Sequence, residues 1–319
     1  MRRDNHLISA AFLAGVKPMK HLQQAHGPEQ QFTISRPGQF QICGRTLHQL
    51  PAGAYTCLVD NCWNPLYQVR DLQVDELIDF PDSLPSRIVQ EVDRFWGLGE
   101  RFSRLGFLHR RGYLFYGKQG SGKSALIHQI VARILSQGHV AFFCQHPSYF
   151  VRCMECFRAV EAERPIVCVF EDIDAIIENY GDGDLLQWLD GNHQVNKAVN
   201  LASTNYPEKL DRRIIARPRR FDRVLRLESP DDRLRAAYFA RKLPEQSPDE
   251  RLRWVRLTEG LPCAALAELI ISVHCLGHDL EESVALLKSL DENSPSSNEF
   301  ADNGVLPRRR RQRQSGEVR

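Results

Sequence analysis

Short apolar runs alternate with helical segments along the middle of the chain, from Tyr113 onward. The apolar runs read "YLFYG", "HVAFFC", "PIVCVFEDID", "VNLASTN" and "RVLRLESP". Each has the length of a strand, and the segments between them carry apolar residues at helical spacing. Strands that alternate with helices favour a parallel sheet with helices on both faces. We therefore predict an α/β subdomain over residues 87–228.

The pattern changes on both sides of this subdomain. Residues 229–291 carry leucine and alanine at helical spacing, which predicts a small lid of about four helices. Residues 1–86 show β-branched and aromatic alternation broken by Pro-Gly and Pro-Ala-Gly turns, which is typical of a small β-rich module. Residues 292–319 are mostly Ser, Asn, Asp, Pro and Arg, a composition that predicts disorder.

The composition is that of a globular protein. The chain has 319 residues, of which 42% are hydrophobic and 26% charged. No apolar run reaches the roughly 20 residues of a membrane-spanning helix, and the N-terminus is unlike a secretory signal. Nine scattered cysteines in a chain of this size favour reduced thiols over a disulfide framework. We therefore expect a cytoplasmic protein with no membrane span.

The formal net charge of +2 hides a difference between the body and the tail. Residues 307–319 hold six arginines and one glutamate, a net +5, so the rest of the chain carries −3. An arginine-rich tail can bind nucleic acid, an acidic protein or a membrane surface, or it can serve only solubility. The sequence leaves these alternatives open.

A glycine-rich motif follows the first apolar run. Gly117, Gly122, Lys123 and Ser124 fit the spacing G-x-x-x-x-G-K-S. In such a loop the backbone N–H groups surround phosphates, the lysine reaches the β- and γ-phosphates, and the serine ligates Mg²⁺. A glycine-rich turn with a surface lysine is the plainer alternative. We predict that the nucleotide is bound by Gly117, Lys118, Gln119, Gly120, Ser121, Gly122, Lys123 and Ser124.

Two acids end the apolar strand "PIVCVF". A carboxylate at this place can hold Mg²⁺, often through water, and its neighbour can orient the attacking water. By position we predict Glu171 as the metal-side acid, together with Ser124, and Asp172 as the water-polarising acid. The same acids could instead cap a helix that begins near Asp174.

Two further features complete the candidate site. Asn205 ends the apolar run "VNLASTN", where its amide could position the attacking water or sense the γ-phosphate; a turn asparagine is the rival interpretation. The segment "RRIIARPRRFDR" packs six arginines between two apolar strands. Such a segment could supply an arginine finger, which stabilises charge during phosphoryl transfer, or it could be a solvated basic loop.

The ordered series of motifs resembles the AAA family of ATPases. The series reads "YGKQGSGKS", "VFEDID", "LLQWLDG", "STNYPEKLD", "RPRRFDR" and "TEGLPCAALAELI". In that family these elements are Walker A, Walker B, the helix before sensor 1, sensor 1, the second region of homology and a lid helix. The resemblance covers roughly residues 87–290. In style it is most similar to the mitochondrial translocase that inserts the folded Rieske iron–sulfur protein and to related bacterial and phage ATPases, without the membrane anchor of the mitochondrial protein.

The resemblance implies ATP and Mg²⁺ as cofactors and a ring of subunits, usually a hexamer. Arg217 and Arg220 match two arginines that reach the γ-phosphate bound by the neighbouring subunit. The chain also departs from the family: Lys118 and Gln119 replace common prolines, the arginine motif lies one residue further along, and Arg219 replaces a glycine. The order of the acids at residues 171–172 is reversed, which implies slow turnover.

Some cysteines and histidines raise the possibility of a metal site. The set C-x-H and C-x-x-C contains Cys144, His146, Cys153 and Cys156, but core thiols explain these cysteines better than zinc. A pair of histidines, at residues 274 and 278, shares a helical face without an acid between them arranged for a metal, which favours ordinary lid histidines.

An aromatic pair follows the run "HVAFFC". Tyr149 and Phe150 lie where ring translocases present a pore loop, but core aromatics at a helix start fit equally well.

These observations lead to three hypotheses. The first is an ATP-hydrolysing AAA ring protein that remodels or moves a macromolecular partner, with a protein client expected but not identified. The second, motivated by the short side chain of Asp172, is a nucleotide-gated adaptor with slow turnover that recruits a partner through residues 1–86. The third is a nucleic-acid loader that uses the arginine-rich tail, against which the acidic body argues.

Overall fold

The computed structural model describes residues 31–36, 39–44, 46–72, 84–211, 214 and 220–292. Arg217 and the predicted tail beyond residue 292 lie outside these ranges. Among the described helices none is long and apolar enough to cross a bilayer.

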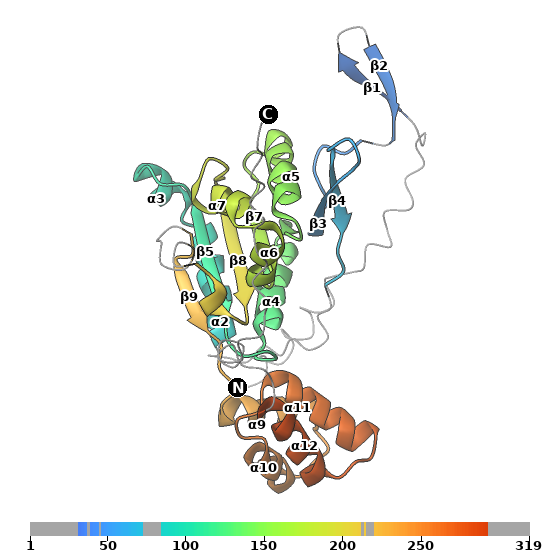
Figure 1. The fold of residues 1–319 in the computed structure, drawn as a ribbon, viewed down its shortest axis with the longest axis vertical. Helices are drawn as coiled ribbons and strands as arrows, with labels where there is room; N and C mark the ends of the chain where they lie inside the picture. Colours follow the sequence, from blue (N-terminus) through green and yellow to red (C-terminus); the bar gives the residue numbers. More distant parts are fainter. Residues whose placement is uncertain are drawn as a thin grey trace, which may run out of the picture.

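Seven strands form the main sheet, in the spatial order β4-β3-β6-β7-β8-β5-β9 (Figure 1). The strands are β3 (Gly53–Val59), β4 (Pro65–Val69), β5 (Arg110–Tyr116), β6 (Val140–Phe143), β7 (Ile166–Phe170), β8 (Ala198–Thr204) and β9 (Arg223–Arg226). All neighbouring strands run parallel except β3 and β4, which are antiparallel. The predicted α/β class with a parallel sheet is confirmed.

Strands β3 and β4 come from the segment that we expected to form a separate N-terminal module. Instead, β3 pairs in parallel with β6, with Tyr55 opposite Phe142, and β4 forms the edge of the sheet. These two strands therefore belong to the same sheet as the strands that follow residue 86. Strands β1 (Gln31–Arg36) and β2 (Gln39–Cys43) pair with each other in a separate antiparallel sheet.

Helices cover both faces of the main sheet. They are α2 (Leu84–Trp96), α3 (Gly99–Arg104), α4 (Lys123–Ser136), α5 (Pro147–Val160), α6 (Ile173–Tyr180) and α7 (Gly183–Asp190), and a short 3₁₀ turn η2 (Pro207–Lys209) follows β8. Alternation along β5 shows the division, because Tyr113 and Phe115 join the core beneath α2 and α4 whereas Leu114 joins the core beneath α5, α6 and α7. The central strands β6, β7 and β8 are thus buried on both faces, which explains their continuous apolar sequences.

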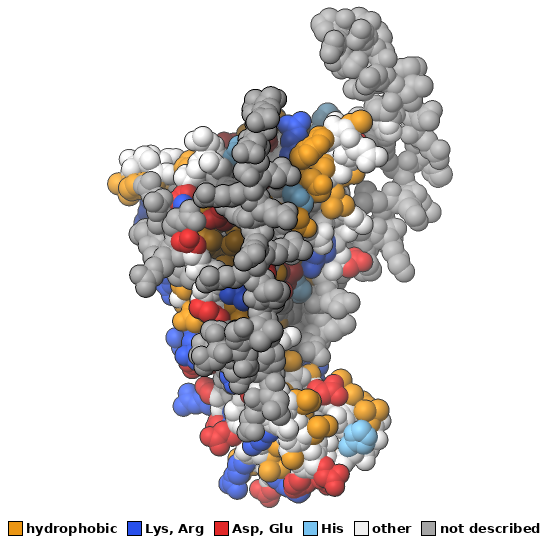
Figure 2. Space-filling model, viewed as in Figure 1, with side chains coloured by type: hydrophobic (Ala, Val, Ile, Leu, Met, Phe, Trp, Pro, Cys, Tyr) orange, Lys and Arg blue, Asp and Glu red, His pale blue; other side chains and the backbone are white. Residues whose placement is uncertain are grey.

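The predicted helical lid is present. It consists of α9 (Asp232–Lys242), α10 (Pro248–Leu257), α11 (Cys263–Ile270), a π-helical turn η3 (Ile271–Cys275) and α12 (Leu280–Glu292). Its own core includes Phe239, Trp254 and Leu269. The lid lies at the end of the sheet where the parallel strands finish (Figure 1), and acidic and basic side chains are mixed over its surface (Figure 2).

Candidate functional site

The loop between β5 and α4 adopts a backbone that favours glycine at Gly117, Gly120 and Gly122. Gly117 has φ +154°, and a Cβ there would collide with the backbone oxygen of Leu227. Gly120 has φ +76°, and a Cβ there would lie 3.1 Å from Cβ of Ala264 in the lid. The N–H of Ala264 also donates to the Gly120 carbonyl at 3.2 Å. The loop therefore lies close to Leu227, which follows β9, and to the start of α11.

Helix α4 begins directly after this loop. Its N-cap is Gly122 in a left-handed conformation, and no side chain caps the first N–H groups. An uncapped helix N-terminus at the end of a glycine loop suits an anion.

The side chain of Lys123 lies inside the loop and is 6% exposed. Its Nζ donates to the carbonyls of Gly117 at 2.9 Å and Lys118 at 2.8 Å. Burial lowers the pKa of Lys123, and the carboxylates of Asp172 and Asp174 partly offset this effect. A buried ammonium, an uncapped helix start and a loop without room for a Cβ together fit a phosphate-bearing nucleotide.

Three of the predicted motifs meet at one edge of the sheet. The loop follows β5, Asp172 follows β7, and Asn205 follows β8, and β8 lies between the other two strands. Because these strands are parallel, their carboxyl ends lie side by side. Nδ2 of Asn205 donates to Oδ1 of Asp172 at 3.3 Å. The structure therefore brings the loop, the acids and the asparagine together.

Asp172 has a left-handed backbone with φ +46°. It is the N-cap residue of α6, but its side chain makes no capping hydrogen bond. The alternative that this acid serves as a helix cap is therefore wrong for its carboxylate, which instead contacts Asn205. Burial raises the pKa of Asp172, and so do the negative charges of Asp174 and Glu171, while Lys123 partly opposes the shift.

Asp174 lies behind this acid and is 8% exposed. Its Oδ1 accepts a hydrogen bond of 2.6 Å from Oγ1 of Thr204, the last residue of β8. This contact ties the start of α6 to β8 and fixes a second buried acid next to Asp172.

Glu171 has cationic or basic neighbours on two sides. Nη2 of Arg70 lies 3.0 Å from its Oε2, and Nε2 of His128 lies 3.4 Å from its Oε1, the latter as an electrostatic contact rather than a well-formed hydrogen bond. Although burial acts to raise it, the pKa of Glu171 is held below its usual range by His128, Arg70 and a hydrogen bond from Ser124. The lowered pKa favours the ionised form of the expected metal-side acid, which lies beside Ser124, and an ionised carboxylate suits Mg²⁺.

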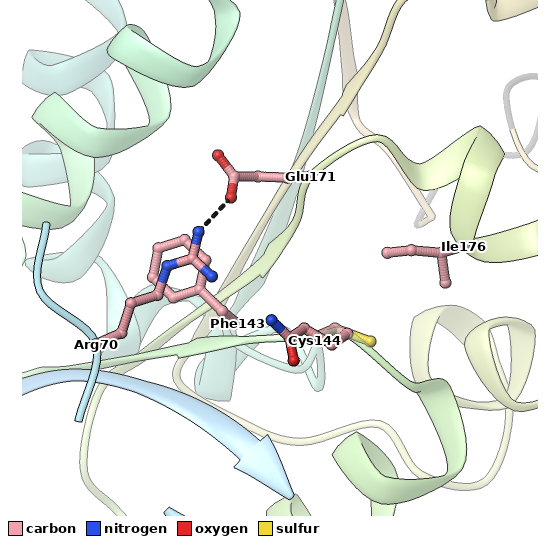
Figure 3. Close-up of a pocket in the computed structure, with 6 residues that line it drawn as sticks. Arg70, Phe143, Cys144, Glu171 and Ile176 are labelled. Atoms are coloured by element: carbon pink, nitrogen blue, oxygen red, sulfur yellow. Dashed lines mark hydrogen bonds and ion pairs between the residues drawn. The ribbon is translucent and has the colours of Figure 1, made fainter. Parts of the chain in front are cut away.

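Arg70 and Glu171 line a cavity of about 270 Å³ together with Phe143 and Cys144. Figure 3 shows the guanidinium of Arg70 over the ring of Phe143 and directed at the carboxylate of Glu171. Sequence reasoning missed Arg70 and His128. Arg70 has no motif of its own, but His128 lies one helical turn after Ser124, and this spacing was a usable signal.

Of the two arginines predicted to act in trans, the structure describes Arg220. Arg217 lies outside the described residues. Arg220 is 5% exposed, and its Nε donates to Oδ2 of Asp190 at 2.6 Å within the same chain. This buried pair does not fit a side chain that is free to reach a neighbouring subunit.

The other sequence candidates occupy ordinary structural positions. Cys144 and Cys153 belong to the core, where Sγ of Cys153 donates to the Leu58 carbonyl at 3.1 Å. His146 stacks on Tyr149 with ring centroids 4.0 Å apart. In the part of the chain that the structure describes, no group of three or more His, Cys, Asp or Glu is arranged to hold a metal ion.

Two further aromatic or histidine candidates are also structural. Phe150 is 1% exposed and packs edge-on against Phe170 and Trp188, so this residue is a core aromatic rather than a pore residue. His274 stacks on Trp254 in the lid.

Residues 113–229 match the family described as "ATPase family associated with various cellular activities (AAA)". Several curated proteins are also similar. The "ATP-dependent zinc metalloprotease FtsH 3" of Sphaerobacter thermophilus is 32% identical over 167 residues, covering 46% of this chain and 33% of that protein. "ATP-dependent zinc metalloprotease FtsH 1" of Sorangium cellulosum is 29% identical over 222 residues, covering 61% of this chain and 33% of that protein.

A third relative, the "ATP-dependent zinc metalloprotease FtsH" of Rhodothermus marinus, is 29% identical over 174 residues, covering 47% of this chain and 24% of that protein. The chain thus spans about a third or less of the length of these relatives. The matched AAA segment contains the loop, both acids, Asn205 and Arg220.

Proposed function

We propose that the chain is a member of the AAA ATPase family, whose model residues 113–229 match, and that it hydrolyses ATP at the site described above. The observation that carries this proposal is the contact between Asn205 and Asp172 at 3.3 Å, next to a phosphate loop with a buried lysine. A phosphate loop alone supports binding. A carboxylate with a raised pKa and an amide that orients it add the means to activate water.

We assign the following roles. Lys123 and the N–H groups at the start of α4 would hold the phosphates, and Ser124 and Glu171 would hold Mg²⁺, whose charge would offset that of the phosphate oxygens. Mg²⁺ sites of this kind use few protein ligands because phosphates and waters supply the rest. Asp172 accepts a proton from the attacking water, and Asn205 orients that water and the carboxylate.

The test is multiple-turnover phosphate release by the full chain with Mg²⁺ and ATP. We expect many phosphates released per chain, and a loss of both ATP binding and release in Lys123→Ala. The expected loss of affinity is about 10- to 100-fold, the range for removing a charged hydrogen-bond donor. Lys242→Ala, which removes a lysine at the end of α9 in the lid, is a matched control and should behave as wild type. Turnover by Lys123→Ala at the wild-type rate would refute the proposal.

We also propose that the protein works as a homo-oligomeric ring, with six subunits as the expected number. Support comes from the position of Arg217 in the family motif. Arg217 then reaches the nucleotide of the next subunit, whereas the buried pair with Asp190 gives Arg220 a structural role unless that pair opens. Arg217→Ala should lower turnover by about 10³ and keep ATP binding.

Mixing two inactive variants tests the ring more sharply. A preparation of Arg217→Ala and one of Asp172→Asn each lack a different half of the site. If the halves come from different subunits, mixed assemblies contain some complete sites and regain activity. No recovery on mixing, or full activity of Arg217→Ala, would refute the assignment in trans.

The biological role that we propose is remodelling or translocation of a protein client by the ring in the cytoplasm. The eight cysteines whose side chains are described are free thiols, in keeping with a reducing compartment. The FtsH relatives carry zinc-protease activity in their names, and that activity remains a property of those proteins. Contacts of the arginine-rich tail with nucleic acid stay a prediction, since the tail lies outside the described residues.

A second candidate function is a nucleotide-gated adaptor. It is favoured by the shorter side chain of Asp172 on a left-handed backbone, which places the carboxylate differently from a glutamate. The phosphate-release assay distinguishes the two candidates. Release that rises with protein concentration supports the motor, and stable retention of ATP supports the adaptor.

A further inference from the structure

Arg70 reaches the candidate nucleotide site from β4, which is an edge strand of the main sheet. It directly follows β4, and its backbone N–H donates to the Ala54 carbonyl on β3 at 2.8 Å. Its guanidinium lies 4.3 Å from the centroid of the Phe143 ring at the end of β6. The backbone anchor and the ring thus fix the direction of the side chain, which ends at Glu171 (Figure 3).

The two oxygens of Glu171 face different partners. Oε2 accepts a hydrogen bond from Nη2 of Arg70 at 3.0 Å, while Oε1 lies 3.4 Å from Nε2 of His128 on α4. His128 and Ser124 are one turn apart on α4, so the Oε1 side is also the side of the predicted metal ligand. An ionised carboxylate has lone pairs on both oxygens, and it can keep a guanidinium on one while the other serves a metal or its water.

We propose that Arg70 is a positioning residue that holds Glu171 for Mg²⁺, so that the β3–β4 hairpin (residues 53–69) sets the metal affinity of the nucleotide site. The inference rests on the proposed function. Arg70 donates to the oxygen of Glu171 that faces away from α4 and thereby orients the other oxygen toward Ser124. Partners that orient a metal ligand typically change metal affinity or activity by about 10- to 100-fold when removed.

A positioning role for Arg70 can be distinguished from a purely structural salt bridge. The side chains of Arg70 and Glu171 are 31% and 23% exposed, so solvent partly screens their pairing and reduces its contribution to folding stability. A structural role predicts a change in the unfolding midpoint with unchanged Mg²⁺ dependence. A positioning role predicts an unchanged unfolding midpoint and a changed Mg²⁺ dependence of ATP binding.

The geometry also gives a physical link between the hairpin and the nucleotide. The hydroxyl of Tyr67 on β4 donates a hydrogen bond to the carbonyl of Cys153 on α5 at 2.6 Å, so β4 is attached to a helix that covers one face of the sheet. A partner that moved β4 would move Arg70, and Glu171 would lose its orientation. Mg²⁺ affinity would then fall without any direct contact between the partner and the nucleotide.

Two variants of the full chain test the proposal. Arg70→Met keeps an apolar stem on the Phe143 ring but removes the charge, and Arg70→Lys keeps the charge but loses the planar fork. Arg152→Ala is the matched control, because it removes an arginine of α5 whose partner Glu155 lies 4.0 Å away on the surface. Each protein is titrated with a fluorescent ATP analogue, once in EDTA and once in Mg²⁺.

We expect the wild type and Arg152→Ala to bind ATP more tightly in Mg²⁺ than in EDTA. In EDTA, Arg70→Met should bind ATP with the same affinity as the wild type. The increase in ATP affinity that Mg²⁺ brings should be about tenfold smaller in Arg70→Met than in the wild type, and Arg70→Lys should recover part of this increase. An unchanged Mg²⁺ gain in Arg70→Met would overturn the inference while leaving the proposed function standing. Absence of ATP binding by the wild type in both conditions would overturn the proposed function itself, and this inference with it.

Discussion

Glu171 and Asp172 are neighbours in the sequence, but the two carboxylates lie in regions of opposite charge. The region around Glu171 is basic, because Arg70 and His128 flank its two oxygens. The region around Asp172 is acidic, with Asp174 and Glu171 close by and Lys123 as the opposing charge. Burial acts on both acids, yet the pKa of Glu171 is lowered and that of Asp172 is raised.

On this difference rests our proposal that the two acids divide the work. A carboxylate that stays ionised suits a divalent cation, and one with a raised pKa suits proton transfer. Glu171 therefore fits the metal and Asp172 fits the water, although their order is reversed relative to the family pattern. The surroundings, rather than the residue type, carry the assignment.

The largest expected effect comes from removing the acid of the acidic region. Asp172→Asn should lower kcat by about 10²–10⁴, the range for loss of a general base, and should keep ATP binding. Steady-state phosphate release and a binding titration measure the two properties separately. Asp249→Asn, a first-turn acid of α10 in the lid, is the control and should match wild type. If Asp172→Asn kept its turnover, the water-polarising role would be refuted.

A somewhat smaller effect is expected in the basic region. Glu171→Gln keeps the shape of the side chain but removes the charge that Mg²⁺ requires. The Mg²⁺ concentration for half-maximal phosphate release should rise by about 10- to 100-fold, and ATP binding in EDTA should not weaken. A half-maximal concentration equal to that of wild type would contradict the assignment of Glu171 to the metal.

The smallest expected effect comes from the buried acid behind Asp172. Asp174→Asn removes one negative charge that raises the pKa of Asp172, so this pKa should fall and kcat should drop by less than about tenfold. Thr204→Val breaks the hydrogen bond to Asp174 but keeps the charge, and it should leave kcat closer to wild type. A larger loss in Thr204→Val than in Asp174→Asn would show that the hydrogen bond, and not the charge, matters.

The sequence predicted the α/β subdomain and the lid because both depend on local periodicity. The run "YLFYG" is β5, and the segment after the loop is α4, beginning at Lys123. The four expected lid helices also appear, with the third continued by a π-helical turn. The phosphate loop was equally visible because its residues are contiguous.

Features that depend on pairing between distant residues were not predictable. The alternation in β3 is the same for a strand of a separate module and for one that joins β6, 87 residues later, so the sequence pattern could not distinguish the two arrangements. Arg70 approaches Glu171 only because of that pairing. Likewise, Arg220 looked like part of a free basic run, but Asp190, 30 residues earlier, binds it.

The most direct test is the rate of hydrolysis of bound ATP in a single turnover, measured for Glu171→Gln and Asp172→Asn as Mg²⁺ is raised. The account predicts that the rate of Glu171→Gln climbs toward that of wild type, because added metal compensates for weaker binding. The rate of Asp172→Asn should stay low at every Mg²⁺ concentration, because no added metal replaces a base. Recovery of both variants, or of Asp172→Asn alone, would contradict the division of roles between the two carboxylates.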